Sequence, residues 1–500
     1  NKRCNMTALE IYLNHRKKIV AQHYVNFVLQ WDMETDAAEQ SIIADSEQMA
    51  VVSEYDYALN TDPEFEKAVA ELYATRNELE APLAHEIEVV YKNIADTKKI
   101  PPEEYTAYSR LTAEAYPMYV KAKNTNDFEL FRPYLEKIVD FCRKQTVWLA
   151  KDKLQGYDVL LDQYEPHYTR TEYDKFFDAL RTKLVPVVKQ MTEHVDPVPA
   201  WATQRFDGEK QRQFCEYLRD VMCFDKSRGI MKQSEHPFTS GFGTDDVRIT
   251  NHYYEDKFDS AIFSVIHETG HALYEQQCDR SLNGTLSGGG ASLGMHESQS
   301  RFFENVIGRS KAFWQVHYAK LQEFFPAQLA AVSLDEFVAY INRAERSFVR
   351  TEADELTYPL HIMLRYEIEQ KLIDGSLQVK DLPEYWRTKF AEYFGITPPT
   401  DTLGVLQDVH WAYGNFGYFP TYALGSAIAS QLFAAMNRDF DVYQSLSCGT
   451  TAKVNEWLRE HVHKYGSSKY PDEILRIATG ESFNPDYYID YLVGKYAGNK

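Results

Sequence analysis

The sequence is poor in cysteine and has no long apolar run. Its six cysteines include no CxxC pair, which excludes a disulfide framework and predicts reduced, mostly buried thiols. They are Cys4, Cys142, Cys215, Cys223, Cys278 and Cys448. No stretch of 18 apolar residues occurs, and the polar start NKRCNMTALE lacks the apolar core of a signal peptide. We therefore expect a cytoplasmic protein with no membrane partner.

Positive charge is also scarce. The 500 residues include 54 Lys and Arg against 74 Asp and Glu, a formal net charge of -20. A surface this acidic repels phosphate backbones, which argues against nucleic acid as a partner. The same charge favours cationic or neutral peptides over acidic ones, through a weak bias that salt would screen.

Most of the chain has the periodicity of amphipathic helices. In Phe128–Ala150 apolar side chains recur at steps of three and four residues, and Gln211–Met222 repeats the pattern. Proline and glycine mark loops, and no repeat, low-complexity tract or linker divides the chain. We predict a mainly helical fold and a single unit over residues 1–500. Within it we expect an approximate N-terminal helical lid at 1–200 and a core with the metal site at 201–500.

One segment departs from helical periodicity. Asp246–Thr250 alternates polar and apolar residues and contains the β-branched Val247 and Ile249. It predicts a short strand or hairpin at the edge of a small sheet, just before the segment that carries the chemistry. Such an edge strand can hold an extended peptide by its main chain.

The segment Phe258–Gln277 has a helical pattern and contains His267-Glu268-Thr-Gly-His271. Residues i and i+4 of a helix share a face, so both imidazoles can reach one metal ion. Glu268 is turned about 100° from His267, close to a metal-bound water without being a ligand. This is the arrangement of a hydrolase in which zinc acidifies water and a carboxylate takes its proton. The alternative is two histidines that merely share a helix.

A catalytic zinc needs a third protein ligand and an open position. Downstream, a glycine-rich loop at Gly284–Gly294 precedes a second predicted helix that begins near Met295. His296, Glu297 and Glu304 are all chemically suitable ligands, and spacing alone does not choose among them. The glycines would let the chain reverse close to the first helix, or would form only a flexible loop.

Six motifs follow one another in order along the chain. They are His236-Pro-Phe238, Asp246-Val-Arg248-Ile-Thr250, His267-Glu268-Thr-Gly-His271, His296-Glu297-Ser-Gln299, Arg350-Thr-Glu-Ala-Asp354 and Gly404-Val-Leu-Gln407-Asp408-Val-His410-Trp411. In this series the sequence resembles the carboxypeptidase Taq family of zinc metallocarboxypeptidases, from about Trp31 to the C-terminus. Two segments depart from that family: Glu34–Glu39 replaces a stretch usually rich in methionine and proline, and Asn251-His252 stands where a threonine and an arginine are common.

The resemblance implies that Glu297 is the third zinc ligand and that Glu268 is the general base. It implies a mostly helical, saddle-like homodimer with a small β-sheet beside a deep active-site groove, and a core similar to those of neurolysin and angiotensin-converting enzyme. The implied cofactor is Zn²⁺, with Co²⁺ or Mn²⁺ as substitutes. The implied activity is hydrolysis of the C-terminal peptide bond of peptides with broad specificity. The net charge further predicts that peptides with acidic C-terminal residues are disfavoured as substrates.

A peptidase that acts at C-termini needs a cation for the terminal carboxylate, and the planar fork of arginine matches both oxygens. Arg350, in a motif of the resembled family, is the first candidate. Its alternative role is a structural ion pair with Glu352 or Asp354. Arg248 is the second candidate, although Asp246 on the same strand face suggests a structural pair.

The tetrahedral intermediate of peptide hydrolysis needs hydrogen-bond donors for its oxyanion. His410 and Tyr422 resemble the histidine and tyrosine that serve this role in related helical zinc peptidases, and Tyr418 is a substitute. Because the chain has 35 tyrosines, packing is the alternative role of any one of them.

Two other functions fit parts of the sequence. An oligopeptidase or dipeptidyl carboxypeptidase would share the zinc chemistry but cut further from the C-terminus. A non-catalytic helical scaffold with a structural zinc would close its site with four protein ligands, and Glu268 would have no task. We therefore predict a zinc metallocarboxypeptidase with peptide substrates.

Overall fold

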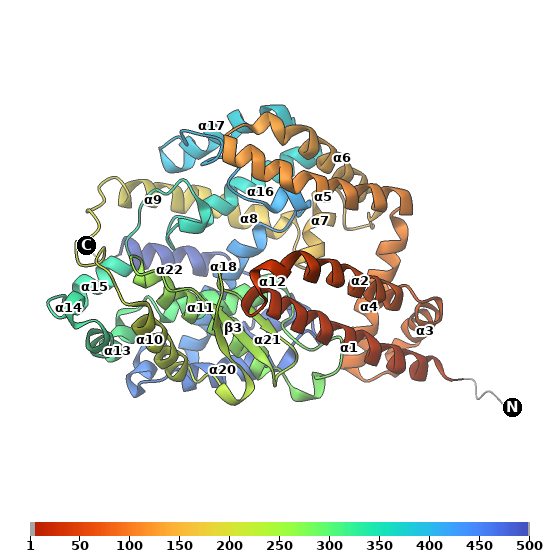
Figure 1. The fold of residues 1–500 in the computed structure, drawn as a ribbon, viewed down its shortest axis with the longest axis horizontal. Helices are drawn as coiled ribbons and strands as arrows, with labels where there is room; N and C mark the ends of the chain where they lie inside the picture. Colours follow the sequence, from red (N-terminus) through yellow and green to blue (C-terminus); the bar gives the residue numbers. More distant parts are fainter. Residues whose placement is uncertain (1–5, 499–500) are drawn as a thin grey trace.

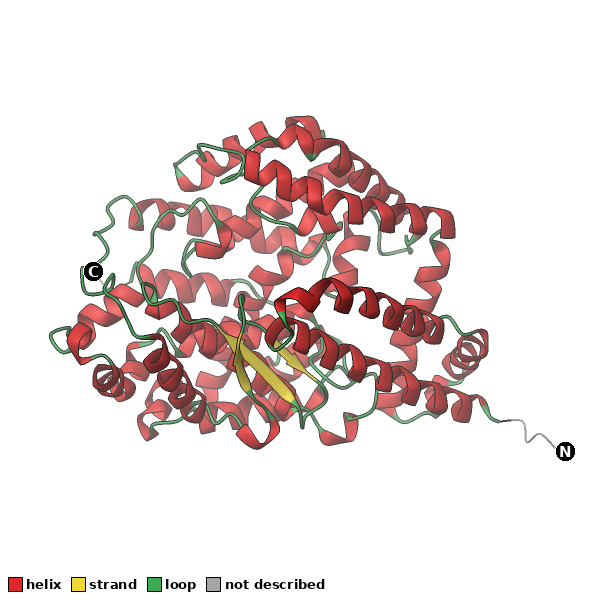
Figure 2. Cartoon of the chain, viewed as in Figure 1, coloured by secondary structure: helices red, strands yellow, loops and turns green. Residues whose placement is uncertain are grey.

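Helices make up most of the chain, and strands occur only in one small sheet within residues 6–498, the part that the computed structural model describes (Figures 1 and 2). The prediction of a mainly helical fold with a small β-sheet is confirmed. The first helices are α1 (Ala8–Thr35), α2 (Ile42–Asn60), α3 (Pro63–Ala74), α4 (Ala81–Lys99), α5 (Pro102–Thr125), α6 (Arg132–Trp148), α7 (Tyr157–Tyr164), α8 (Arg170–Ala179) and α9 (Val185–Met191).

The sheet and the remaining helices follow in the second part of the chain. They are α10 (Gly208–Val221), β1 (Met231–Gln233), β2 (Thr239–Gly241), β3 (Val247–Asn251), α11 (Phe258–Gln277), α12 (Leu293–Arg301), the π-helical turn η7 (Phe302–Ile307), α13 (Lys311–Phe324), α14 (Pro326–Leu329), α15 (Leu334–Ile341), the 3₁₀ turn η8 (Arg350–Glu352), α16 (Tyr358–Asp374), α17 (Leu382–Phe394), η10 (His410–Tyr413), α18 (Pro420–Asp439), α19 (Val442–Ser445), α20 (Ala452–His461), α21 (Pro471–Thr479) and α22 (Asp486–Tyr496).

The three helices predicted from periodicity are present. The segment Phe258–Gln277 is α11 with the predicted bounds, and Gln211–Met222 lies in α10 except for its last residue. The segment Phe128–Ala150 is a 3₁₀ turn at Phe128–Leu130 followed by α6, whose first turn contains Pro133. A proline ring is tolerated there because the first helical N–H groups have no partner within the helix.

The sheet has the strand order β1-β3-β2. β1 runs parallel to β3 with Met231 opposite Ile249, and β2 runs antiparallel to it with Ser240 opposite Arg248. The predicted strand at Asp246–Thr250 is therefore confirmed as β3, but its predicted position at the edge of the sheet is wrong. β3 is the central strand, with neighbours on both sides.

The buried apolar side chains form two clusters. The smaller cluster belongs to the N-terminal helices α1, α3 and α4 and consists of Tyr12, Ile19, Phe65, Val69, Leu72 and Ile87. The larger cluster extends from Ala115 in α5 to Leu492 in α22 and includes the helices of the candidate site. Packing therefore distinguishes α1, α3 and α4 from the rest, whereas the proposed division near residue 200 stays a prediction.

The first helix contacts the sheet through aromatic rings and one guanidinium. The Cζ atom of Arg248 lies 4.7 Å from the ring centroid of Phe27 and 5.4 Å from that of Trp31, both in α1. Trp31 also packs edge-on against Phe238, with 5.7 Å between the ring centroids. In Figure 1 α1 and α2 accordingly extend from beside the sheet toward the right of the view.

Two features expected from composition concern thiols and membranes. Five described cysteines are free, as predicted: Cys142, Cys215 and Cys278 are buried, and Cys223 and Cys448 are exposed. Cys4 lies outside the described residues. Among residues 6–498, no helix has both the length and the apolar character needed to cross a bilayer.

Candidate metal centre and active site

Two glycines allow three helices to meet at the candidate site. A Cβ atom on Gly270 of α11 would lie 2.8 Å from the carbonyl oxygen of Gln299 and 2.9 Å from Cα of Ser300 in α12. On the other side of α12, a Cβ atom on Gly425 of α18 would lie 2.7 Å from both Cβ and Cγ of Glu297. Because real Cβ atoms do not approach so closely, only glycine permits α12 to pack between α11 and α18 at these points.

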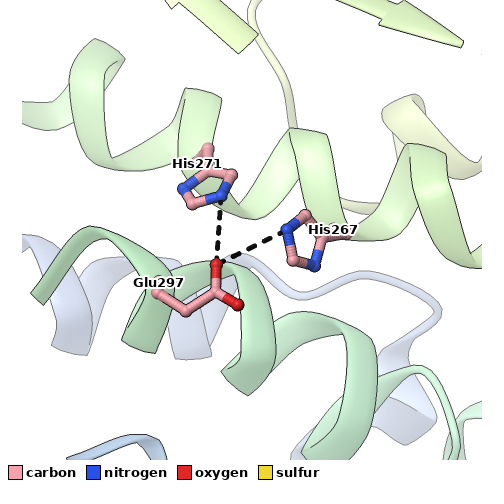
Figure 3. A group of neighbouring side chains, drawn as sticks. All are labelled: His267, His271 and Glu297. Carbon is pink, nitrogen blue, oxygen red and sulfur yellow. Dashed lines mark ion pairs between the residues drawn. The ribbon is translucent and has the colours of Figure 1, made fainter. Parts of the chain in front are cut away.

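Three potential metal-binding side chains converge where α11 faces α12 (Figure 3). Nε2 of His267 and Nε2 of His271 each lie 3.6 Å from the same oxygen, Oε2 of Glu297. The three ligand atoms lie within 4.8 Å of one another. Two imidazole nitrogens and one carboxylate oxygen form a donor set typical of catalytic zinc, which keeps a fourth position for water or substrate. The residues therefore fit a metal of this kind.

The other two candidates for the third ligand lie behind the histidines. Nδ1 of His267 lies 2.8 Å from Oε2 of Glu304 in η7, and Nδ1 of His271 lies 2.6 Å from Nδ1 of His296. Both contacts involve the ring nitrogen that points away from Glu297. Such partners fix the tautomer and orientation of a ligating imidazole. The structure thus groups Glu297 with the two histidines and gives His296 and Glu304 supporting positions.

Arginines keep the carboxylates of the site ionised. Nε of Arg301 donates to Oε1 of Glu297 at 2.7 Å, and its Nη1 donates to Oε2 of Glu304 at 3.2 Å. Burial alone would raise the pKa of Glu297, but Arg301 and the two histidines hold it well below its usual value. Burial also opposes ionisation of Glu304, yet Arg301 and His267 lower its pKa to about 2. A carboxylate must be deprotonated to bind a metal, and Glu297 is.

The carboxylate of Glu268 is held by the edge strand β2. Oγ1 of Thr239 donates to Oε2 of Glu268 at 2.6 Å and also lies 2.9 Å from its main-chain oxygen. Glu268 is only 8% exposed, and this burial raises its pKa above the usual value. Glu268 therefore has an oriented carboxylate with a raised pKa, which suits a base that takes a proton from water.

Arg350 is part of a buried cluster with more positive than negative charge. Its Nη2 lies 2.8 Å from Oδ1 of Asp408, and Nη2 of Arg365 lies 2.5 Å from Oδ2 of the same carboxylate. Two guanidiniums therefore share one carboxylate, which leaves a formal excess of one positive charge. The sequence-based alternative paired Arg350 with Glu352 or Asp354, but the ion-pair partner found among the described residues is Asp408.

His410, Tyr418 and Tyr422 gather beside Arg350. Nε2 of His410 lies 3.2 Å from the hydroxyl of Tyr422, and Cζ of Arg350 lies 5.0 Å from the centroid of the Tyr422 ring. The rings of Tyr418 and Tyr422 are 5.4 Å apart between centroids. Tyr422 lies three residues before Gly425 on α18, so it occupies the same helix face as the glycine that contacts Glu297. This places Tyr422 on the side of α18 that faces Glu297, with His410 and Tyr418 as its neighbours.

Burial largely determines the protonation states of His410 and Tyr422. Burial and the charges of Arg350 and Arg365 lower the pKa of His410 to about 4, against the opposing effect of Asp408. Burial raises the pKa of Tyr422, and the negative charge of Glu297 acts in the same direction. At neutral pH His410 is therefore uncharged and Tyr422 keeps its proton, so the phenol can donate a hydrogen bond.

Arg248 occupies a different environment. Its Nε and Nη2 donate to the two carboxylate oxygens of Asp246 at 2.8 Å and 2.7 Å, while its guanidinium packs on the rings of Phe27 and Trp31. One guanidinium faces one carboxylate, so this pair has no excess charge. The structure places Arg248 in the contact between α1 and the sheet.

One important neighbour of the site was not predicted from the sequence. The carboxylate of Glu369, in α16, accepts from Nε1 of Trp411 at 2.8 Å, from N of Gly417 at 2.8 Å and from the hydroxyl of Tyr157 at 2.5 Å. Trp411 and Gly417 lie in the segment that runs from His410 to Tyr418. Glu369 therefore fixes this segment, although no local motif distinguishes it from other glutamates on helices.

A cavity of about 1030 Å³ lies between the N-terminal helices and the loop that leads into α12. Its walls include His23 of α1, Glu86 and Lys92 of α4, and Gly288 and Ala291 of the loop. None of the three metal-binding side chains lines it. The cavity is therefore distinct from the cluster of metal-binding side chains.

Comparison with known proteins places these features in a family. A family model described as carboxypeptidase Taq (M32) metallopeptidase matches residues 11–496. Carboxypeptidase 1 of Bacillus subtilis (strain 168) is 41% identical over 480 residues, 95% of each chain. Thermostable carboxypeptidase 1 of Pyrococcus furiosus is 34% identical over 498 residues, 98% of this chain and 99% of the relative. The crystal structure of the M32 carboxypeptidase from Deinococcus radiodurans R1 superposes with a TM-score of 0.94 at 31% identity, over 98% of this chain and 99% of that one.

Proposed function

The chain belongs to the carboxypeptidase Taq (M32) family of metallopeptidases, and from this premise we propose that it removes single residues from the C-termini of peptides with a zinc ion held by His267, His271 and Glu297. Membership makes the protein a metallocarboxypeptidase that depends on a divalent metal. The observation that supports the particular ligands is the convergence of both histidine Nε2 atoms on Oε2 of Glu297, each at 3.6 Å.

In the proposed reaction Glu268 is the base. Zinc, when bound, acidifies water and polarises the carbonyl of the scissile bond. Glu268, oriented by the Thr239 hydroxyl at 2.6 Å, accepts a proton from the attacking water and passes it to the nitrogen of the leaving residue. Its position next to His267 in α11 brings the carboxylate to the metal site without making it a ligand.

Tyr422 is the proposed donor to the oxyanion of the tetrahedral intermediate. Its hydroxyl is protonated at neutral pH, and the uncharged His410 lies 3.2 Å from it and orients it. Donors placed in advance at a buried site stabilise developing negative charge strongly because they need not reorient. Tyr418, whose ring contacts Tyr422, is the second candidate for the same task.

Arg350 is the proposed anchor for the terminal carboxylate of the peptide. The cluster of Arg350, Arg365 and Asp408 has an excess of one positive charge, which a substrate carboxylate would balance. Arg365 is fully buried, and Arg350 is the member whose guanidinium packs on the ring of Tyr422. Arg248, paired one to one with Asp246, lacks this excess charge.

The proposal also covers substrate preference, oligomeric state and cellular location. The net charge of -20 makes peptides that end in Asp or Glu poorer substrates, and added salt should narrow their disadvantage. If salt does not affect the disadvantage, pocket shape and not net charge is its cause. We retain homodimer formation and cytoplasmic location as proposals from the family resemblance and the sequence.

Metal removal and a ligand variant test the proposed site. Enzyme stripped with a chelator should stop releasing C-terminal residues and recover with one equivalent of Zn²⁺ per chain; Co²⁺ and Mn²⁺ should be compared in parallel. Glu297→Gln should bind less zinc, measured by metal analysis after dialysis. Glu255→Gln, which alters an exposed carboxylate paired with Arg205, is the matched control. Full zinc content in Glu297→Gln would move the third ligand to His296 or Glu304.

A further inference from the structure

The second histidine of the metal cluster has its own supporting chain. Nδ1 of His271 lies 2.6 Å from Nδ1 of His296, and Nε2 of His296 lies 2.7 Å from Oε1 of Glu275. His267 is supported differently, because its Nδ1 faces the Glu304 carboxylate directly at 2.8 Å. One metal-binding histidine therefore has a carboxylate as its partner, and the other reaches a carboxylate only through a second imidazole.

The contacts allow one arrangement of protons that leaves His271 able to bind a metal. The Glu275 carboxylate accepts hydrogen bonds, so Nε2 of His296 bears a proton. In a neutral imidazole the other nitrogen is then bare, and Nδ1 of His296 is an acceptor. In this arrangement the proton in the 2.6 Å contact belongs to Nδ1 of His271. Its Nε2 keeps a free lone pair, directed at the metal-binding oxygen of Glu297.

The glycine-rich loop encloses this chain. N of Gly290 donates to Oε1 of Glu275 at 3.0 Å, and a Cβ atom on Gly290 would lie 2.5 Å from Cδ2 of His296 and 2.9 Å from Cε1 of Tyr274. The Tyr274 ring packs against His296 with 5.1 Å between centroids, and its hydroxyl accepts from N of Ala291 at 3.0 Å. The loop thus packs closely over both partners, and the imidazole of His296 cannot turn over without displacing it.

From this geometry we propose that His296 and Glu275 are positioning residues that fix the tautomer of His271 and thereby raise the affinity of the site for its metal. Neither residue is a ligand or contacts substrate. The inference rests on the proposed metal ligands and adds to them how one ligand is kept ready. It also assigns a role to the glycine-rich loop, because Gly290 lets the loop pack over His296 and Glu275.

Three variants test this chain through the zinc dissociation constant, measured without substrate by competition with a chromophoric chelator at fixed pH. His296→Leu removes the acceptor, and affinity should fall about 10- to 100-fold, the usual effect of losing a partner of a metal ligand. His296→Asn keeps an acceptor oxygen near the place of Nδ1 and should recover part of the loss. Glu275→Leu removes the acceptor for Nε2 of His296, so the tautomer of His296 is no longer fixed and zinc binding should also weaken.

Controls separate this inference from general damage and from the ligand assignment. His317→Asn alters a buried histidine that bonds to Tyr217 outside the site, and it should bind zinc as wild type does. The metal-free variants should melt at the wild-type temperature, so that a lower affinity is not a folding defect. Wild-type affinity in both His296→Leu and Glu275→Leu would overturn the positioning role alone. Wild-type affinity in His271→Ala would instead overturn the proposed ligands.

Discussion

Replacing Arg350 with alanine removes the proposed anchor and leaves the metal ligands and Glu268 in place. Asp408 keeps its ion pair with Arg365 at 2.5 Å, so the buried carboxylate is not left without a partner. The cluster changes from an excess of one positive charge to a neutral pair. A free terminal carboxylate would then have no balancing charge beside Tyr422, while hydrolysis of a correctly placed bond would remain chemically feasible.

The expected loss follows from the contact removed. A charge-assisted, bidentate guanidinium–carboxylate contact contributes about 1.5–3 kcal/mol. At about 1.36 kcal/mol per factor of ten, kcat/KM should fall roughly 10- to 150-fold for a peptide with a free C-terminus. Arg350→Lys should recover only part of this, because an ammonium restores the charge without the planar fork.

The informative assay compares one peptide as its free acid and as its C-terminal amide. Wild type should strongly prefer the acid, and Arg350→Ala should lose most of that preference because the contact that separates the two substrates is gone. Arg248→Ala is the matched control: it removes an arginine paired with Asp246, and the preference for the acid should stay. Equal discrimination by Arg350→Ala and wild type would refute the reasoning, and loss of discrimination in Arg248→Ala would transfer the role to Arg248.

Three further perturbations have defined outcomes. Glu268→Gln should keep its zinc but lose about 10²- to 10⁴-fold in kcat, and near wild-type turnover would place the base elsewhere. Gly425→Ala puts a methyl group against Glu297 and should lower the unfolding free energy by about 1–3 kcal/mol and weaken zinc binding. Gly494→Ala, which has open space around it, should be neutral or slightly stabilising. Equal melting curves for the two variants would contradict this. Burial raises the pKa of Glu165 to about 7 in the folded state, above its ordinary value of 4.5, so its contribution to stability falls as pH rises between these values. The unfolding free energy of Glu165→Gln, measured with urea, should therefore rise relative to that of wild type by up to about 3 kcal/mol from pH 4 to pH 8. Parallel pH profiles of the two proteins would refute the assignment.

The parts of the site that lie on one helix could be predicted from the sequence. Phe258–Gln277 has clear helical periodicity, and the spacing of His267 and His271 places both on one face whatever surrounds them. The series of motifs predicted the family, and the family model confirms it. The strand at Val247–Asn251 was also recognisable, because alternation and β-branched residues are local signals.

The parts that depend on contacts between distant segments could not be predicted from spacing. The grouping of Glu297, in place of His296 or Glu304, with the two histidines follows from how α12 faces α11. Gly270 and Gly425 permit this packing through close approaches that no motif indicates. Arg350 pairs with a carboxylate 58 residues away and not with a neighbour in its own motif.

The position of β3 in the sheet was mistaken for a related reason. Its partners β1 and β2 are only three residues long, too short for alternation to reveal them. A strand flanked by such short segments reads as an edge strand even when it is central.

The central claim is that this metal site releases single residues from free C-termini. The most direct test is mass spectrometry, over time, of an N-acetylated peptide incubated with the zinc-loaded enzyme. The account predicts a ladder in which each product is shorter by one C-terminal residue. Products that shorten by two residues at a time, or internal fragments, would contradict it.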